Sequence, residues 1–107
     1  MKWFSATCLA LACHVSLAAD THEATIVIED HRFAPAELVV PADRKVKLTV
    51  VNKDNTPEEF ESYELNREKI VVGNGQIVVF IGPLKPGRYP FFGEFHMETA
   101  KGVLIAE

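Results

Sequence analysis

Charged or polar side chains alternate with apolar ones in Lys45-Val46-Lys47-Leu48-Thr49-Val50-Val51, and this alternation is the clearest indication of the fold. Side chains of a β-strand point alternately to its two faces, so this pattern places Val46, Leu48 and Val50 on one face. That face meets an apolar core and the other meets water. Such half-buried strands are typical of two sheets packed face to face, about 10 Å apart.

Five more apolar or β-branched runs lie on either side of this stretch, and turn residues bound each of them. The expected strands are residues 24–28, 37–40, 45–51, 76–81, 88–92 and 102–106. Six or seven short strands with Gly/Pro punctuation predict an all-β fold, an antiparallel β-sandwich or barrel. A parallel sheet is not expected, because the chain has no room for crossover helices. A helical turn is expected at most at residues 63–69.

Residues 1–18 have the features of a secretory signal peptide. Lys2 supplies the positive start, residues 3–18 carry no acidic or basic side chain apart from a histidine, and Ser16-Leu17-Ala18 surrounds the cleavage point. We expect an exported domain at residues 19–107, located in the periplasm without direct membrane insertion. A retained anchor is disfavoured, since the apolar run is short for a membrane span. A lipoprotein acylated at Cys13 is the alternative.

Cleavage would remove both cysteines, Cys8 and Cys13, and leave no thiol in the mature domain. A thiolate nucleophile, a redox Cys-x-x-Cys motif and a cysteine-ligated zinc or iron–sulfur site are then excluded. Without Lys2 the chain keeps ten basic and fifteen acidic side chains, a net charge of −5. This charge argues against nucleic acid and anionic membrane surfaces as partners, and it permits a cation as ligand.

Side chains that can bind metals gather in three segments. One follows the 45–51 strand, a second follows the 88–92 strand, and a third leaves the first strand. Successive turns of an antiparallel sandwich alternate between its two ends, so several of these loops can share one end. Carboxylate, imidazole and thioether groups together suit copper, iron or zinc. The candidate metal ligands are His96, Glu58, His31, Met97, Glu59 and Glu94, and the same segments contain two further carboxylates, Glu61 and Glu98.

Each candidate also has an interpretation without metal. His96 would be a loop histidine hydrogen-bonded to a carboxylate such as Glu58, and His31 would be a surface histidine. Glu58 and Glu59 would form a solvated acidic turn, although one of them should point inward because the phenylalanine that follows must reach the core. Met97 would be exposed or fill the core, as is commoner for methionine.

A wider pattern spans essentially the whole mature chain: Phe33-Ala34-Pro35, Val40-Pro41-Ala42-Asp43, residues 52–57, and Leu84-Lys85-Pro86-Gly87-Arg88-Tyr89 through His96 to Gly102. This pattern resembles the cupredoxin fold of the blue copper proteins, a Greek-key β-sandwich. In that family two histidines, a cysteine and a methionine close the copper site.

The chain departs from the cupredoxin pattern at three of the four ligands. The match keeps His96, but it places Glu58 at the first histidine, Gly93 at the cysteine and Lys101 near the methionine. A blue copper centre depends on the bond between copper and thiolate. The mature chain is therefore not expected to be a blue-copper electron carrier.

Two stretches carry a closer similarity: Thr56-Pro57-Glu58-Glu59-Phe60-Glu61-Ser62 and Gly93-Glu94-Phe95-His96-Met97-Glu98-Thr99-Ala100-Lys101-Gly102. They resemble the cupredoxin-like periplasmic components of EfeO-type iron-uptake systems and the small partners of Ftr1-type iron permeases. The resemblance implies a protein that binds copper or iron and assists ferrous iron uptake or oxidation. An inner-membrane iron permease and its periplasmic partners are the implied partners. Whether the protein is an enzyme stays open, because it would either oxidise Fe(II) or hand iron onward.

Two other functions stay open at this point. A copper-homeostasis carrier would bind Cu(I) through Met97 and histidines and have no role in iron uptake. A metal-free interaction module would use the acidic end of the scaffold to dock a partner protein, since a fold does not fix a function. A hydrolase is disfavoured, because no serine or cysteine nucleophile pairs with a histidine at a recognisable spacing.

Overall fold

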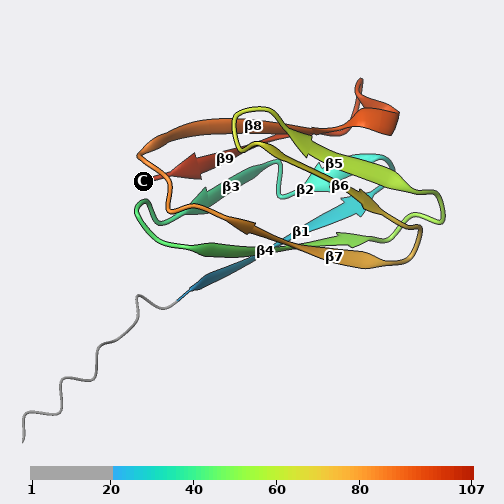
Figure 1. Cartoon of the computed structure of the whole chain (residues 1–107). Helices are drawn as coiled ribbons and strands as arrows, with labels where there is room; N and C mark the ends of the chain where they lie inside the picture. Colours follow the sequence, from blue (N-terminus) through green and yellow to red (C-terminus); the bar gives the residue numbers. More distant parts are fainter. Residues whose placement is uncertain (1–20) are drawn as a thin grey trace, which may run out of the picture.

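The computed structural model describes residues 21–107 and arranges nine β-strands in two facing sheets (Figure 1). One sheet has the strand order β2-β1-β4-β7, and the other has the order β3-β9-β8-β5-β6. The all-β sandwich expected from the alternating stretch is therefore confirmed. The elements are β1 His22–Glu29, β2 Arg32–Ala34, β3 Glu37–Val40, β4 Val46–Asn52, β5 Glu58–Ser62, β6 Arg67–Val71, β7 Gln76–Ile81, β8 Gly87–Gly93, the 3₁₀ helix η1 Glu94–His96 and β9 Lys101–Ala106.

The described residues include all of the expected strands and all of the candidate ligands. The expected signal peptide at residues 1–18 and both cysteines lie outside them. Within residues 21–107, no helix has the length and apolar character needed to cross a membrane.

The expected strands are all present, and β3 and β7 have the expected bounds. Strands β2, β5 and β6 have no counterpart among them. The helical turn expected at residues 63–69 is wrong, because residues 63–66 form a turn and β6 begins at Arg67. Ser62 of β5 lies opposite Arg67, so this turn closes an antiparallel hairpin.

Two strand pairs are parallel, which corrects the expectation of a purely antiparallel sandwich. Ile26 of β1 lies opposite Val50 of β4, and Leu38 of β3 lies opposite Leu104 of β9, each in a parallel ladder. Parallel neighbours need a crossover connection, but the crossover need not be a helix. Here the chain leaves β2, forms β3 in the other sheet and returns as β4 (Figure 1). The opposite sheet supplies the crossover.

Strand β4 forms the centre of the core, as its alternation predicts. Val46, Leu48 and Val50 have no exposed surface, whereas the side chains between them are partly exposed. Burial of a side chain of this size contributes about 1.5–3 kcal/mol. The hydrophobic effect therefore fixes which face of β4 points inward.

Three phenyl rings of the core lie close to the segments that carry candidate ligands. The ring centroids of Phe33, Phe60 and Phe91 are 5.0 to 6.2 Å apart, with two edge-to-face contacts and one tilted contact. Such contacts contribute about 0.5–1.5 kcal/mol each beyond burial. The rings belong to β2, β5 and β8. Their packing therefore positions the β1–β2 turn, the glutamate-rich strand β5 and the segment that leads from β8 into η1.

Candidate metal centre

The tip of the β1–β2 hairpin carries His31 at one end of the sandwich. Asp30 and His31 both have positive φ, 52° and 56°, as the central residues of a tight two-residue hairpin turn do. Aspartate and histidine tolerate this region better than most residues. The carboxylate of Asp54 accepts hydrogen bonds from both backbone N–H groups, 2.9 Å from Asp30 and 3.0 Å from His31. These bonds tie the hairpin tip to the turn after β4.

Asp54 is itself held in place by Asn52, the buried last residue of β4. The Oδ1 of Asn52 accepts the backbone N–H of Asp54 at 3.0 Å, and its amide nitrogen donates to the carbonyl of Thr56 at 2.9 Å. The backbone N–H of His31 is the main cause that lowers the pKa of Asp54, helped by that of Asp30 and by nearby imidazole charge and opposed by burial. Asp54 is therefore an ionised carboxylate beside the hairpin tip.

Glu58 lies at the start of β5 with 1% of its surface exposed. Its Oε1 accepts hydrogen bonds from the backbone N–H groups of Glu59 at 3.0 Å and Phe95 at 2.8 Å. Its Oε2 lies 2.6 Å from Nδ1 of His96. Both oxygens are thus engaged, and the carboxylate orients the ring of His96.

Gly93 provides the space that the carboxyl group of Glu58 fills. A Cβ at position 93 would lie 2.6 Å from the Cδ of Glu58 and 2.7 Å from the Cβ of Ala100. These separations are far shorter than the optimal contact of about 3.5–4.0 Å between carbon atoms. The departures at positions 58 and 93 are therefore physically coupled: the glutamate needs the glycine.

The imidazole rings of His31 and His96 stack, with centroids 3.6 Å apart and planes 12° from parallel. The hydroxyl of Thr99 donates to the carbonyl of His31 at 2.6 Å and joins the hairpin tip to the segment after η1. Nδ1 of His31 lies 3.4 Å from Oδ2 of Asp54, and Nδ1 of His96 lies 2.6 Å from Oε2 of Glu58. A carboxylate oxygen that accepts the hydrogen bond at 2.6 Å favours a proton on Nδ1 of His96 and leaves the lone pair of that ring on Nε2.

An open pocket of about 400 Å³ adjoins the two rings, and we call it the histidine pocket. Met97 lines this pocket and is 53% exposed, so its side chain does not fill the core. The pocket offers two imidazole nitrogens, a thioether and a carboxylate, and residues 21–107 contain no cysteine. These donors do not fit a blue copper centre, whereas imidazole and thioether groups are donor types that copper accepts. The lining residues are His31, Phe95, His96, Met97, Glu98 and Thr99.

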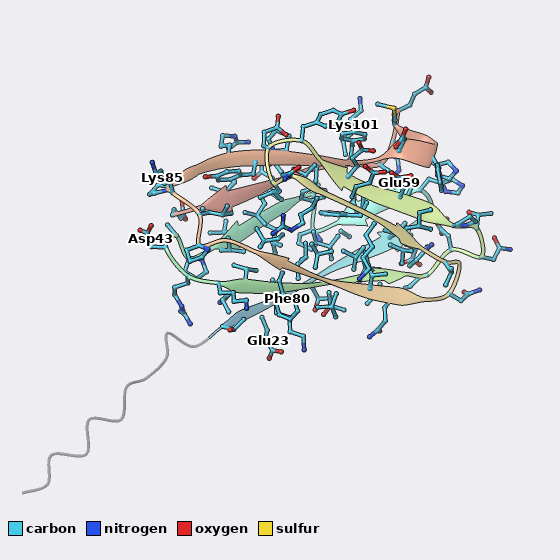
Figure 2. All side chains as sticks on the ribbon, in the orientation of Figure 1. Glu23, Asp43, Glu59, Phe80, Lys85 and Lys101 are labelled. Atoms are coloured by element: carbon cyan, nitrogen blue, oxygen red, sulfur yellow. The ribbon has the colours of Figure 1, made fainter. Side chains whose placement is uncertain are left out.

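Glu59 and Glu94 lie outside the histidine pocket. Side chains alternate along β5, so Glu59 points to the outer face of its sheet while Glu58 points inward. Together with Glu61, they form a group whose carboxylate oxygens lie within 4.8 Å of one another, which we call the glutamate cluster. Figure 2 shows Glu59 near η1, at the end of the molecule far from Lys85. The structure thus divides the candidate ligands between two places.

Two residues at this end of the molecule, Asp54 and Thr99, are not among the side chains that the sequence singles out. Asp54 contacts a hairpin tip more than twenty residues earlier in the chain. The sequence signal for it is the Asn-x-Asp pattern of a side-chain-capped turn. Thr99 lies two residues after Met97, and only the folded segment brings it into the pocket wall. The spacing of residues along the sequence does not reveal such contacts between loops that are far apart in the chain.

Several solved structures have the same strand arrangement. Auracyanin A, a "blue" copper protein of Chloroflexus aurantiacus, matches with a TM-score of 0.71 and 14% identity, over 82% of this chain and 100% of that chain. The metal-binding domain of the Cu(I)-exporting P-type ATPase CopA of Streptococcus pneumoniae D39 matches with a TM-score of 0.64 and 19% identity, over 79% of this chain and 84% of that chain. A purple cupredoxin of Nitrosopumilus maritimus matches at 0.61 and 18%, over 78% and 99%. At these identities the likeness shows the fold.

Sequence comparison identifies the family. The chain is 48% identical over 83 residues to an uncharacterised protein of Rickettsia prowazekii (strain Madrid E), a match that covers 78% of this chain. It spans 66% of that relative, just under two thirds. The family model of the cupredoxin-like domain matches residues 3–106. Strand arrangement and sequence agree with the cupredoxin resemblance of the turn segments, and the chain belongs to the cupredoxin-like domain family.

Proposed function

We propose that the chain is an exported copper-binding protein that holds the metal in the histidine pocket and assists ferrous iron uptake or oxidation in the periplasm. One observation carries the copper site: His31 and His96 stack, and each has a carboxylate at Nδ1. A carboxylate at the far nitrogen fixes the tautomer of a metal-binding histidine and raises its basicity. Both imidazole rings are partly exposed, so burial in the core does not explain why each one lies against a carboxylate.

The other residues of the pocket take distinct roles in this proposal. Met97 offers a thioether that suits Cu(I), and the imidazoles with Glu98 suit Cu(II). Glu58 is a positioning residue, because its oxygens are already used by nitrogen donors. Copper, when bound, would supply one-electron exchange with ferrous iron. Copper is favoured over zinc because solved structures of similar fold include a "blue" copper protein and a domain with Cu(I).

The copper site is tested by titrating the protein with Cu(II), Cu(I) and Zn(II) and comparing two histidine variants. His96→Ala should weaken copper binding by at least about tenfold, which corresponds to about 1.4 kcal/mol. His22→Ala is the matched control, because His22 pairs with Val46 at the opposite end of β4, and it should bind copper like the unchanged protein. Equal affinities in the two variants would remove the site assignment.

The iron role is supported by the two stretches that resemble iron-uptake components, residues 56–62 and 93–102. Cells that produce His96→Ala in place of the unchanged chain should take up radiolabelled ferrous iron as slowly as cells without the protein. An inner-membrane iron permease would be the partner. Unchanged iron uptake together with increased copper sensitivity would instead indicate a copper-homeostasis carrier, which the exposed thioether of Met97 favours.

A metal-free interaction module is separated from both by thermal unfolding. A ligand that binds only the folded state must raise the unfolding temperature. The copper proposal therefore predicts an increase on adding copper to the unchanged protein and a much smaller increase for His96→Ala. An unfolding temperature that does not respond to any of the three metals would support the interaction module.

A further inference from the structure

The outer face of the second sheet carries carboxylates that the copper proposal does not use. β5 lies between β6 and β8 in that sheet. Phe60 points into the core, so Glu59 and Glu61 on either side of it point outward. Each brings one oxygen within 4.8 Å of the other and of an oxygen of Glu94 in η1. Three oxygens at this spacing are close enough to coordinate a single cation.

Glu59 and Glu61 are buried although they face outward, each with 8% of its surface exposed. Oε1 of Glu59 and Oε2 of Glu61 have no hydrogen-bond partner among residues 21–107. Buried carboxylates are normally hydrogen-bonded, paired with a charge or bound to a metal. Glu58 on the same strand shows the ordinary solution, since three nitrogen atoms contact its oxygens. The unpartnered oxygens therefore point to a cationic ligand.

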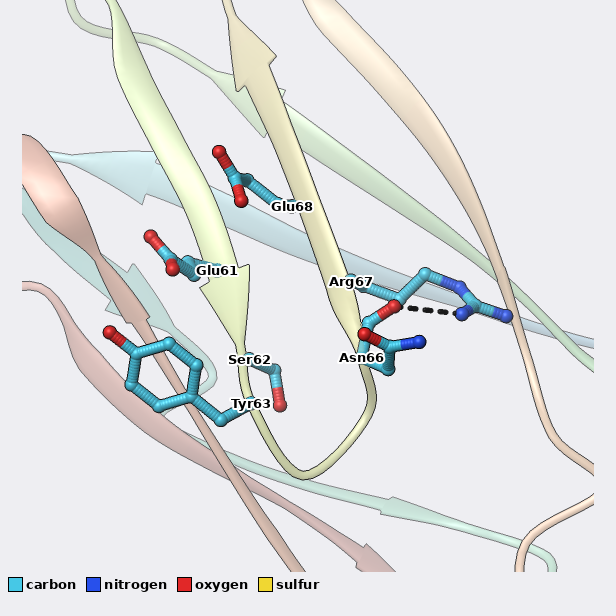
Figure 3. A pocket seen from close by; sticks show the side chains of 6 residues that line it. All are labelled: Glu61, Ser62, Tyr63, Asn66, Arg67 and Glu68. Carbon is cyan, nitrogen blue, oxygen red and sulfur yellow. Dashed lines mark hydrogen bonds between the residues drawn. The ribbon is translucent and has the colours of Figure 1, made fainter.

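Arg67 on the neighbouring strand β6 does not neutralise this group. Its guanidinium donates to the carbonyls of Phe80 at 3.0 Å and Asn66 at 2.9 Å. Figure 3 shows that it extends away from the carboxylates of Glu61 and Glu68. Glu68 lies opposite Glu61 in the β5–β6 ladder and brings a further negative charge to the same face. Glu68 therefore adds a fourth acidic side chain beside the three of the glutamate cluster, and Lys101 of β9, which lies opposite Phe92, is the basic residue in the same row of the sheet as Glu61.

The crowding of the carboxylates raises their pKa values. A hydrogen bond with Glu68, together with burial and with Glu94, raises the pKa of Glu59 from 4.5 to about 7. A hydrogen bond with Glu94, together with burial, raises the pKa of Glu61 to about 7 as well. A cation bound among these carboxylates would reduce the repulsion between them.

We propose that the glutamate cluster is a second metal site, separate from the histidine pocket, that binds a hard cation such as Mn(II) through oxygen atoms alone. Hard cations prefer carboxylate ligands, whereas Cu(I) prefers sulfur and nitrogen. The two places therefore select metals by different ligand chemistry. Because they share no ligand, binding at the glutamate cluster does not depend on copper binding at the histidine pocket.

The test is a titration with Mn(II), a paramagnetic hard cation, measured by calorimetry and by broadening of backbone amide signals in the NMR spectrum. Signals of Glu59, Glu61 and Glu94 should broaden first. The double variant Glu59→Gln/Glu61→Gln keeps the shape of both side chains and removes their charges, so Mn(II) affinity should fall at least about tenfold. Glu64→Gln removes one charge from the exposed turn after β5 and should bind like the unchanged protein.

Equal Mn(II) affinity in the double variant and the unchanged protein would overturn the proposal. Broadening spread evenly over exposed carboxylates, or no binding at millimolar Mn(II), would also overturn it. Glu94→Gln covers the case in which the double variant does not fold, because Glu94 is exposed, and it should also lose Mn(II) affinity. His96→Ala should lose copper and keep Mn(II), so the failure of either site is distinguishable from the failure of the other.

Discussion

Glu58 and Glu59 are neighbours on β5, and the fold treats their identical carboxylates in opposite ways. Glu58 faces inward, and two backbone N–H groups and the ring of His96 contact its oxygens. Glu59 faces outward with an unpartnered Oε1 and a raised pKa. Burial of a carboxylate is therefore not enough to identify it as a metal ligand. A fully hydrogen-bonded carboxylate positions its neighbours, whereas an unpartnered one still has coordination capacity.

The largest expected effect comes from exchanging the two residues for alanine in turn. Glu58→Ala leaves two backbone N–H groups and an imidazole without their acceptor, and each such loss costs about 1–3 kcal/mol. We expect a decrease of about 3 kcal/mol or more in the free energy of unfolding, measured by urea denaturation. Glu59→Ala should cost much less, because it leaves no backbone N–H group without an acceptor and relieves repulsion between crowded carboxylates. Similar losses in both variants would contradict the division of roles.

A smaller effect is expected at Gly93. A substitution there changes the surroundings of Glu58 but not those of Glu59, and it alters no charged residue. Gly93→Ala drives a methyl group into the carboxyl of Glu58 and the Cβ of Ala100. Overpacking of this kind costs about 1–3 kcal/mol, and displacement of Glu58 should also weaken copper binding. Gly87→Ala on the same strand is the control, because its Cβ would meet its nearest neighbour at 3.6 Å. Equal stability of the two variants would show that a methyl group at position 93 is accommodated, and it would contradict the predicted clash with Glu58 and Ala100.

The next effect concerns the second imidazole of the pocket. Asp54→Asn removes the charge beside His31 and turns one acceptor oxygen into a donor. Outer partners of metal-binding histidines typically contribute about 10–100-fold to affinity, and we expect about a tenfold loss of copper affinity by titration. Asp43→Asn removes the same charge from a turn at the other end of the molecule, and asparagine tolerates its φ of 58°. Equal copper affinities would remove Asp54 from the site.

The sequence was sufficient for the framework of the fold, because the framework depends on local patterns. The alternation of residues 45–51 predicts the half-buried β4. Turn residues mark the ends of the expected strands 37–40 and 76–81, which have the same bounds as β3 and β7. β5 escaped prediction because glutamates occupy both of its faces, so the apolar period of two is missing. β5 is a strand because it pairs with β6 and β8. β6 is not among the expected strands, and β8 is distant along the chain.

The arrangement of the site depended on contacts that no spacing shows. That loops share one end of a sandwich follows from topology, but the stacking of His31 on His96 requires the hairpin tip and η1 in register. The candidate ligands also include Glu59, whose separation from the histidines follows only once β5 is known to be a strand. One residue of strand register decides to which face a glutamate belongs.

A last expected effect is a pH dependence of stability near neutral pH that comes from the glutamate cluster. The pKa values of Glu59 and Glu61 rise from 4.5 to about 7 in the folded protein, so between these values the folded state binds more protons than the unfolded state. Their contribution to stability is then complete below about pH 4.5 and is lost as the pH rises through about 7. Asp54 acts with the opposite sign and below that window, because its pKa is lowered from 3.8.

Urea denaturation of the metal-free protein at about pH 5 and about pH 8 measures this difference. The unchanged protein should lose more stability between the two conditions than Glu59→Gln/Glu61→Gln, because the glutamines do not titrate. Glu64→Gln should follow the unchanged protein, and histidine titration cancels because it is common to all three chains. Parallel pH profiles for all three would mean that Glu59 and Glu61 ionise without hindrance, in which case the unpartnered oxygens would reach water and the glutamate cluster would be an ordinary acidic surface.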